Sequence, residues 1–392
     1  MNKENNKISN GVKIAVFYIY PPDPGGLSQQ GHLLYRGLKD IGCEVMPCHY
    51  KPSFQKQWVL NVYKPDIAIG IGCWTDTPDI ILSPQRNGIL PIPWLLADGW
   101  VANYREEISS LPLVFATSQW VKDTFKRDGV KVDNFSVLPI GFDPEEIKPI
   151  PRSDSKVQGL REMLGIRPEE KMILTIGGDV TTKGAQEMLK ALAQIDKNFK
   201  NWKYVCKALD SEYEAKHHEE EKNLIKKLDL DPGKILYLTG TSSHDFMPYL
   251  LSACDIYAAP SRLEGFGMIQ LEAMACGKPV VSINIGGPAD TIISGKTGFL
   301  AEVEETTKLN EEWALASMGF DADHKTKFDE PKVFAYRASI SDLVKYTTQL
   351  LTDDGLREEM GKNAYEHALA NYNYKLIAQK ALATIKEKLN LS

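Results

Sequence analysis

The chain has 392 residues, of which 43% are hydrophobic and 25% are charged, and its formal net charge is −6. One hydrophobic core stops growing at roughly 250–300 residues, so this length predicts two domains. The acidic balance argues against nucleic-acid binding, which requires a basic surface, and no segment approaches the roughly 20 apolar residues of a membrane helix. Six scattered cysteines without a Cys-x-x-Cys pair, together with a polar N-terminus, predict reduced thiols in a cytoplasmic protein.

The first third of the chain alternates short apolar runs with amphipathic stretches. The apolar runs predict strands, and the amphipathic stretches predict helices. Strands that alternate with helices are typical of a parallel sheet covered on both faces. The predicted strands cover 12–19, 66–71, 90–96, 113–118 and 135–140, and the predicted helices cover 27–41 and 119–127.

A proline-rich, charged segment over 144–155 indicates a linker, after which the same pattern restarts. We therefore expect an α/β protein with two Rossmann-like doubly wound domains, spanning 1–148 and 149–370, whose active site lies in a cleft at the carboxyl ends of the strands. The polar stretch over 303–335 shows no clear element and is interpreted as an irregular insertion or functional loop. In the second domain, strands are predicted at 172–176, 204–208, 235–238, 256–259 and 280–283, and a helix at 185–195.

The segment over 260–279 is the most informative one in the sequence. A predicted strand ends at Ala259, and Gly265 and Gly267 allow the backbone to approach a ligand closely. The free N–H groups of the helix that follows form a site for an anion. This helix is almost wholly apolar yet carries Glu272, and a buried carboxylate is costly unless it is hydrogen-bonded. Ribose hydroxyls are suitable partners; a backbone cap or a lysine is the alternative.

Glu264 and Glu272 stand within Pro-Ser-x-x-Glu-Gly-Phe-Gly-x-x-x-x-Glu-Ala-Met-Ala-x-Gly-x-Pro, which closely resembles the signature of the group 1 (family 4) glycosyltransferases. These enzymes have the GT-B fold. The resemblance covers most of the chain and implies that helix 371–392 returns to the N-terminal domain. Further similar segments are the glycine-rich loop 22–26, the turn 137–143, the phosphate-binding loop 176–184 and the closing segments 282–287 and 297–300.

The resemblance implies transfer of a sugar from a nucleotide-diphosphate-sugar donor to an acceptor, with retention of anomeric configuration and without a cofactor or metal. The acceptor, whether a sugar, a lipid-linked sugar or a small molecule, is not identified. Glu272 would bind the ribose, Lys183 would neutralise the diphosphate, and Glu264 would hold the sugar. The implied catalytic residues are Glu264, Lys183 and Asp98, and the implied donor-binding residues are Gly25, Gly26, Gly178, Lys183, Arg262, Gly265, Phe266, Gly267 and Glu272.

Ile140 stands where the family usually has an asparagine, and two further departures concern the site itself. Gly178 stands where the family usually has an arginine, so that part of the cationic clamp is missing, and Arg262 or Lys207 could replace it. Asp98 stands where a histidine commonly contacts the transferred sugar, although Asp-Gly is also a frequent turn sequence.

The sequence also allows functions other than glycosyl transfer. A glycosidase would need its two carboxylates roughly 5–9.5 Å apart, whereas eight residues of helix rise about 12 Å. A non-catalytic subunit that binds sugar nucleotides, or a phosphorylase on the same fold, would also fit the sequence.

The helix over 119–127 is expected to pack on its own sheet, and peripheral membrane contact is its alternative. Adjacent His217 and His218 point apart on a helix, which favours a solvated face over a metal site.

Overall fold

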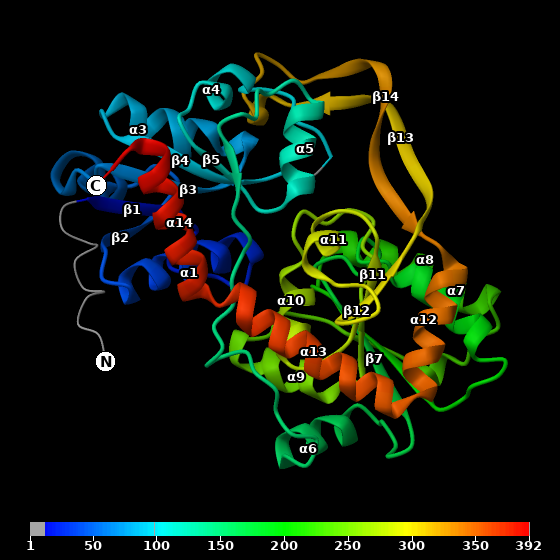
Figure 1. Cartoon of the computed structure of the whole chain (residues 1–392). Coiled ribbons are helices and arrows are strands. Elements are labelled where there is room, and N and C mark those ends of the chain that lie inside the picture. The colour runs from blue at the N-terminus through cyan, green and yellow to red at the C-terminus, as the bar shows by residue number, and fades with distance from the viewer. Residues whose placement is uncertain (1–11, 98, 392) are drawn as a thin grey trace, which may run out of the picture. The chain divides into compact units, whose positions relative to one another are not determined.

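The computed structural model describes residues 12–97 and 99–391, and the chain divides into two compact units (Figure 1). The first unit comprises the residues up to Asp143, Leu309–Lys332 and the residues from Tyr372 onward. The second unit comprises Pro144–Lys308 and Val333–Asn371. These divisions lie near the predicted boundaries at 148 and 370. The assignment of the tip of the polar insert to the first unit was not predicted.

The first unit contains a six-stranded sheet with the order β2-β1-β3-β4-β5-β6. Neighbouring strands pair in parallel, and the fully buried apolar run of β1 is typical of a strand covered on both faces. β2 was missed by the sequence prediction because it is a half-exposed edge strand that contains Pro47. The strands are β1 (Lys13–Tyr18), β2 (Glu44–His49), β3 (Ile67–Cys73), β4 (Leu90–Leu96), β5 (Val114–Ala116) and β6 (Phe135–Val137).

Helix α14 (Tyr374–Leu389) packs against α1 (Gly26–Asp40) within the first unit. The approach is close, because a Cβ atom on Gly37 would lie 2.7 Å from Cβ of Ala378. The Tyr374 hydroxyl also donates to Asp40 over 2.6 Å. The predicted return of the C-terminal helix is therefore confirmed. The other helices of this unit are α2 (Phe54–Trp58), η1 (Val59–Tyr63), η2 (Trp74–Asp76), η3 (Pro78–Leu82), α3 (Ser83–Arg86), α4 (Arg105–Ser109) and α5 (Gln119–Arg127).

The apolar side of α5 faces the core of its own unit. Val121 and Phe125 are fully buried, and Phe125 contacts the ring of Phe135 on the neighbouring strand β6. This confirms the expected packing of the helix against its own sheet. No helix among the described residues has the length and apolar character needed to span a membrane.

The second unit contains another six-stranded sheet, with the order β12-β11-β10-β7-β8-β9. Its strands also pair in parallel. Two doubly wound sheets confirm the predicted fold class. The strands are β7 (Lys171–Ile176), β8 (Trp202–Lys207), β9 (Ile235–Leu238), β10 (Ile256–Ala258), β11 (Val280–Ile283) and β12 (Gly298–Ala301). The helices are α6 (Ser155–Met163), α7 (Ala185–Ile195), α8 (Glu212–Lys227), η4 (Pro232–Lys234), η5 (His244–Phe246), α9 (Met247–Ala253), α10 (Met268–Ala275), α11 (Gly287–Thr291), α12 (Ile340–Thr352) and α13 (Asp354–Tyr372).

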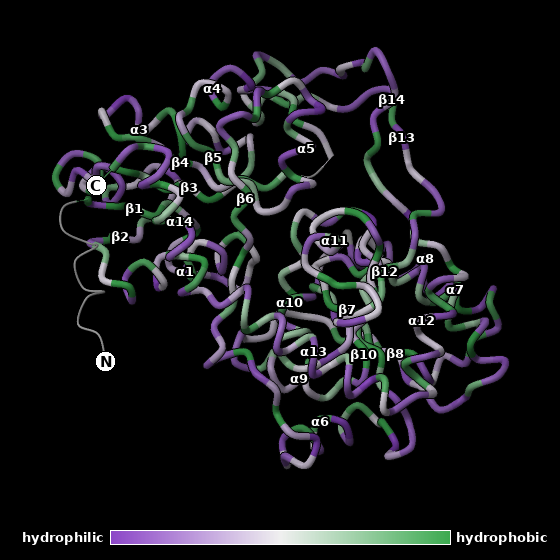
Figure 2. The backbone as a smooth tube through the Cα atoms, in the orientation of Figure 1, coloured by the Kyte–Doolittle hydropathy of each residue, from purple (hydrophilic) through white to green (hydrophobic). Residues whose placement is uncertain are grey.

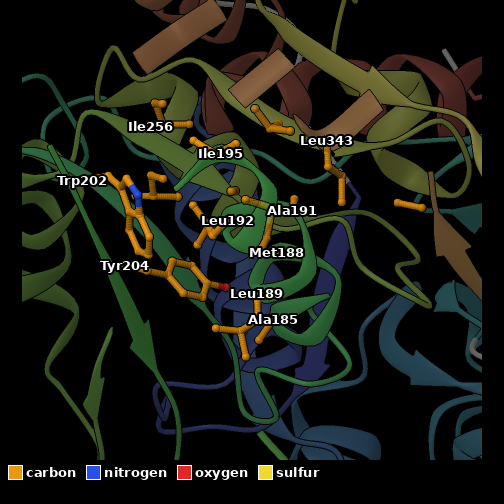
Figure 3. Packing of buried hydrophobic residues seen from close by; sticks show 14 of the residues in the cluster. Ala185, Met188, Leu189, Ala191, Leu192, Ile195, Trp202, Tyr204, Ile256 and Leu343 are labelled. Carbon is orange, nitrogen blue, oxygen red and sulfur yellow. The ribbon is translucent and has the colours of Figure 1, made fainter. Parts of the chain in front are cut away.

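Helix α7 supplies the centre of the apolar core of the second unit (Figure 3). Its buried residues recur with helical spacing, and they pack against Trp202 and Tyr204 of β8, Ile256 of β10 and Leu343 of α12. Each such leucine or methionine contributes about 1.5–3 kcal/mol by leaving water. This core holds the N-terminal end of α7 in place directly after the phosphate-binding loop of the family pattern. The buried residues of α7 are Ala185, Glu187, Met188, Leu189, Ala191, Leu192 and Ile195.

The insert over 303–335 is not irregular, so that prediction was wrong. It forms two long strands, β13 (Val303–Ala314) and β14 (His324–Ala338), which pair as a separate two-stranded sheet with η6 (Ala316–Met318) between them. Most of its side chains are at least partly exposed, and Figure 2 colours much of both strands as hydrophilic. A strand without a buried face lacks the apolar alternation by which strands are recognised in a sequence.

Candidate functional site

The loops with the predicted donor residues follow β7 and β10, which are neighbours in the second sheet. The chain runs from β7 outward through β8 and β9, and then returns to β10 and continues to the opposite edge. The boundary between β7 and β10 is therefore the point where the strand order reverses. Ligands of doubly wound proteins bind at the carboxyl ends of strands at such a point. The fold thus places the loops 177–184 and 259–267 at the position expected for a ligand site.

The loop after β7 is shaped by close approaches that only glycine permits. A Cβ atom on Gly177 would lie 2.4 Å from Cγ of Lys183, so the lysine side chain lies across this residue. Gly184 has a φ of +86°, and a Cβ atom there would lie 2.4 Å from the carbonyl oxygen of Pro260. Gly178 is different, since a Cβ atom would meet only the Leu209 side chain at 3.5 Å. The missing family arginine is therefore not excluded by the backbone at this position.

Lys183 and Glu264, both predicted as site residues, lie in contact with each other. Nζ of Lys183 donates to Oε2 of Glu264 over 2.7 Å, and both side chains remain partly accessible to solvent. The backbone N–H of Arg262 donates to the carbonyl of Thr182 over 2.8 Å, which joins the two loops directly. The arrangement fixes a cation and a carboxylate side by side at the end of the sheet.

The loop after β10 rests on a second glycine-rich turn. The backbone N–H of Gly287 donates to the carbonyl of Glu264 over 2.9 Å. A Cβ atom on Gly286 would lie 2.4 Å from that same carbonyl oxygen, and one on Gly287 would lie 2.2 Å from Cα of Phe266. The Phe266 side chain is buried, so this residue can offer a ligand its backbone only.

Helix α10 begins after Gly267, whose φ of +94° is in the left-handed region that favours glycine. The helix carries Glu272, which is 5% exposed. Its Oε2 atom is buried and has no hydrogen-bond partner among the described residues. The lysine or backbone partner that the alternative interpretation requires is not found for this oxygen. An orphaned carboxylate oxygen in a buried position is a candidate acceptor for a ligand hydroxyl.

The ring of Tyr257, on strand β10, connects the two glutamates electrostatically. Burial raises the pKa of Tyr257 well above its usual value, and the negative charges of Glu264 and Glu272 raise it further. The hydroxyl donates to the carbonyl of Ile176 at the end of β7. This neutral side chain therefore lies against the end of β7 and within the field of both carboxylates.

The sequence did not single out His244, which lies next to Glu272. Its Nε2 is 3.6 Å from Oε1 of Glu272, and its Nδ1 is 3.6 Å from Oε2 of Glu146. His244 begins η5, in the polar loop that follows β9, and it has no motif of its own. The sequence did show a polar loop at the carboxyl end of a strand, where ligands often bind. Such a loop does not indicate which of its residues faces the site.

Both cations suggested as replacements for the missing arginine are already paired with protein groups. The Arg262 guanidinium donates to both oxygens of the buried Glu187, and Arg337 donates to the same carboxylate. Nζ of Lys207 donates to the carbonyl of Gly240 over 2.9 Å, and burial lowers the pKa of this lysine. Both side chains fix the surrounding loops in the structure.

The face of α8 that contains His217 is not fully solvated, so that expectation was wrong. Nδ1 of His217 lies 3.0 Å from Oδ2 of Asp179 in the loop after β7. The buried Glu221 accepts a hydrogen bond from Thr181 of the same loop over 2.6 Å. Burial raises the pKa of Glu214, on the same helix, to about 7, and the charge of Asp179 contributes. Side chains of helix α8 therefore contact the loop after β7 and help to hold it in place.

The remaining predicted residues belong to the first unit. Gly25 and Gly26 start α1 after β1, beside the strand-order reversal between β1 and β3. The backbone N–H of Gly25 donates to the side chain of Asp23 over 2.9 Å, which makes a local turn. Asp98 lies outside the described residues. Within 12–97 and 99–391, no group of three or more His, Cys, Asp or Glu side chains is arranged to hold a metal ion.

Residues 157–317 match the family model of the glycosyl transferases group 1. An uncharacterized glycosyltransferase of Methanocaldococcus jannaschii is 32% identical over 166 residues, which cover 42% of this chain and 43% of the relative. A D-inositol 3-phosphate glycosyltransferase of Corynebacterium jeikeium is 27% identical over 277 residues, which cover 71% of this chain and 57% of the relative. The matched region thus spans about half the length of these curated relatives.

The solved structure of HepE from Anabaena, in complex with UDP and glucose, resembles this chain with a TM-score of 0.70. Its sequence identity is 18%, and the alignment covers 96% of this chain and 100% of the other. At this level of identity the similarity concerns the fold alone.

Proposed function

We propose that this chain, whose residues 157–317 belong to the group 1 glycosyl transferases, transfers a sugar from a nucleotide-diphosphate sugar to an acceptor. The observation that carries the proposal is the combination of Lys183, Glu264 and the orphaned buried oxygen of Glu272 at one strand-order reversal. It supplies a cation for phosphate, a carboxylate for sugar hydroxyls and a carboxylate for ribose.

The donor would lie across the carboxyl ends of β7 and β10. The ribose hydroxyls would donate to Glu272, and the diphosphate would lie between Lys183 and the backbone N–H groups at the start of α10. Glu264 would accept from hydroxyls of the transferred sugar while it keeps Lys183 in place. UDP-sugars are reasonable first candidates because the similar HepE structure holds UDP and glucose.

We further propose that the configuration at the anomeric carbon is retained. In this mechanism the departing diphosphate accepts the proton of the acceptor on the face from which the acceptor attacks. The protein contributes orientation and charge stabilisation. Lys183 and the N-terminus of α10 would offset the charge that builds on the diphosphate, so the chemistry proposed requires no metal.

The two glutamates are expected to respond differently to substitution. Glu272→Ala should weaken the binding of free nucleoside diphosphate about tenfold or more, because charge-assisted hydrogen bonds to ribose are lost. Glu264→Ala should lower turnover more than nucleotide affinity, because its partner is the sugar. Calorimetric titration with UDP, GDP and ADP and single-turnover transfer assays measure both effects.

Glu220→Ala is the matched control for these variants, since Glu220 is an exposed glutamate on α8 in the same unit. The Glu220→Ala variant should have the nucleotide affinity and the turnover of wild type. A folded Glu272→Ala protein with wild-type nucleotide affinity would remove Glu272 from the proposed site. Equal effects of the two variants on nucleotide binding alone would contradict the proposed division of roles.

A non-catalytic sugar-nucleotide-binding subunit is the second candidate, and the absence of the family arginine at Gly178 favours it. A thermal-shift screen of UDP-, GDP- and ADP-sugars would find the donor, because a ligand at about 100 times its dissociation constant stabilises by about 2.7 kcal/mol. Binding without turnover, with or without acceptors, would support this subunit. Release of a sugar phosphate with inorganic phosphate would instead identify a phosphorylase.

We propose that Asp98 lies beside the transferred sugar, in place of the usual histidine of the family. As a carboxylate it can accept a hydrogen bond from a sugar hydroxyl and stabilise positive charge at the anomeric carbon. Asp98→Asn, which has nearly the same shape, should then lower turnover at least about tenfold with little loss of stability. A turn residue would tolerate asparagine, so near-normal turnover of the folded variant would assign Asp98 to the turn.

A further inference from the structure

The two carboxylate oxygens of Glu272 have different surroundings. One carboxylate oxygen, Oε1, lies 3.6 Å from Nε2 of His244, whereas Oε2 is buried without a partner among the described residues. A carboxylate has two oxygens with about four acceptor positions. His244 can therefore engage one oxygen of Glu272 and leave the other available to a ligand.

His244 has a second acidic neighbour, and its loop is anchored nearby. Its second ring nitrogen, Nδ1, lies 3.6 Å from Oε2 of Glu146, in the segment before α6. The loop that carries it is anchored at Gly240, whose carbonyl accepts from the buried Lys207. The imidazole thus bridges two carboxylates from different parts of the second unit, a geometry in which both ring nitrogens act as donors when the ring is protonated.

We propose that His244 is a positioning residue of the donor site: it orients Glu272 toward the ribose and makes nucleotide binding depend on its own protonation. This inference rests on the proposed function, because the role of Glu272 toward ribose is part of it. The imidazolium would fix the rotamer of Glu272 through Oε1, so that Oε2 receives the ribose hydroxyls. The positive charge of the imidazolium would also reduce the electrostatic repulsion between a bound diphosphate and the carboxylates of Glu272 and Glu146.

The charges around His244 set the direction of the pH dependence. The hydrogen-bonding interaction with Glu272 raises the pKa of His244 above its ordinary 6.5, burial opposes this, and the charges of Glu272, Glu146 and Asp245 raise it further. The protonated form therefore persists to higher pH than in a free histidine. If that form favours nucleotide, affinity is highest below the raised pKa and falls as the pH rises through it.

The experiment measures the affinity of full-length wild type, His244→Gln and His244→Ala by calorimetry between pH 5.5 and 8.5. The probes are the tightest binder among UDP, GDP and ADP and its 2′-deoxy counterpart. At low pH both variants should bind the ribonucleotide about fivefold more weakly than wild type. At high pH the difference should nearly vanish, and the pH dependence that remains in the variants belongs to the nucleotide phosphate and other groups.

The comparison with the 2′-deoxynucleotide separates positioning from a general structural effect. Wild type should prefer the ribonucleotide about tenfold, and His244→Ala should reduce this preference, because a misoriented Glu272 loses its contact with the 2′-hydroxyl. A distorted site would weaken both ligands equally. His324→Gln is the control, since His324 is exposed in the hairpin, and it should match wild type.

The results distinguish a failure of the role proposed for His244 from a failure of the proposed donor site. If Glu272→Ala abolishes the preference for ribose while both His244 variants keep the wild-type preference and pH dependence, the role of His244 is overturned and the proposed function stands. If wild type binds no nucleotide, or if Glu272→Ala keeps full preference for ribose, the proposed donor site fails, and the inference fails with it.

Discussion

Replacement of Lys183 by alanine is expected to lower the rate of sugar transfer about 100-fold, with a much smaller effect on the affinity for the intact sugar-nucleotide donor. A cation that faces a leaving diphosphate stabilises charge that develops mainly in the transition state, and the loss of one such group typically costs about 10²–10³ in rate. The side chain is fixed in place, because it lies across Gly177 and its Nζ donates to Glu264 over 2.7 Å.

Single-turnover measurements at saturating donor test this prediction directly. Lys197→Ala is a suitable control, because Lys197 is an exposed lysine just beyond the other end of α7. Transfer by wild type should also persist in the presence of a strong chelator. Normal transfer by a folded Lys183→Ala protein would contradict the assigned role, and loss of wild-type activity with EDTA that manganese or magnesium restores would replace the metal-independent mechanism.

Gly287→Ala is expected to destabilise the second unit by about 3 kcal/mol and to abolish tight donor binding. The new Cβ atom would lie 2.2 Å from Cα of Phe266 and 2.6 Å from its carbonyl oxygen. These are backbone atoms, so no side-chain rotation relieves the contact, and overpacking of this kind costs about 1–3 kcal/mol or more. The loop that carries Glu264 would have to move, since Gly287 also donates to its carbonyl.

Thermal unfolding and nucleotide titration check both parts of this prediction. A loss of about 3 kcal/mol corresponds to a decrease of roughly 6–12 °C in Tm for a unit of this size. Gly159→Ala provides the matched substitution, because Gly159 is in helix α6 and a Cβ atom there meets nothing within 4 Å. It should be neutral or slightly stabilising. A Gly287→Ala protein with the wild-type Tm would show that the loop accommodates the methyl group.

Local patterns were sufficient for the parts of the site that depend on local geometry. Gly267 has the positive φ that its position before α10 requires, and the apolar helix after it is buried as its composition predicted. Lys183 and Glu264, 81 residues apart, were expected in one site only through the resemblance to a family. Their 2.7 Å contact exists because β7 and β10 are adjacent in the sheet.

The side-chain contacts that the sequence did not reveal join residues far apart in the chain. Arg262 was expected to face the donor, but its guanidinium is bound by Glu187, 75 positions earlier in the chain. His244 reaches Glu272 only because the loop after β9 folds toward α10. No local motif marks either pair, since hydrophobic periodicity reports which face of an element is buried and not which charged groups meet.

Continuous apolar runs and glycine turns are local properties of a chain, so the two doubly wound α/β units, most strands and the signature helix could be predicted from the amino-acid sequence. It did not determine the hairpin over 303–338, whose strands are largely exposed on both faces and carry no apolar alternation. The folded chain was needed to show which cations are already paired and that one oxygen of Glu272 has no protein partner among the described residues. These pairings depend on which strands and loops become neighbours, and that follows from the packing of the whole sheet.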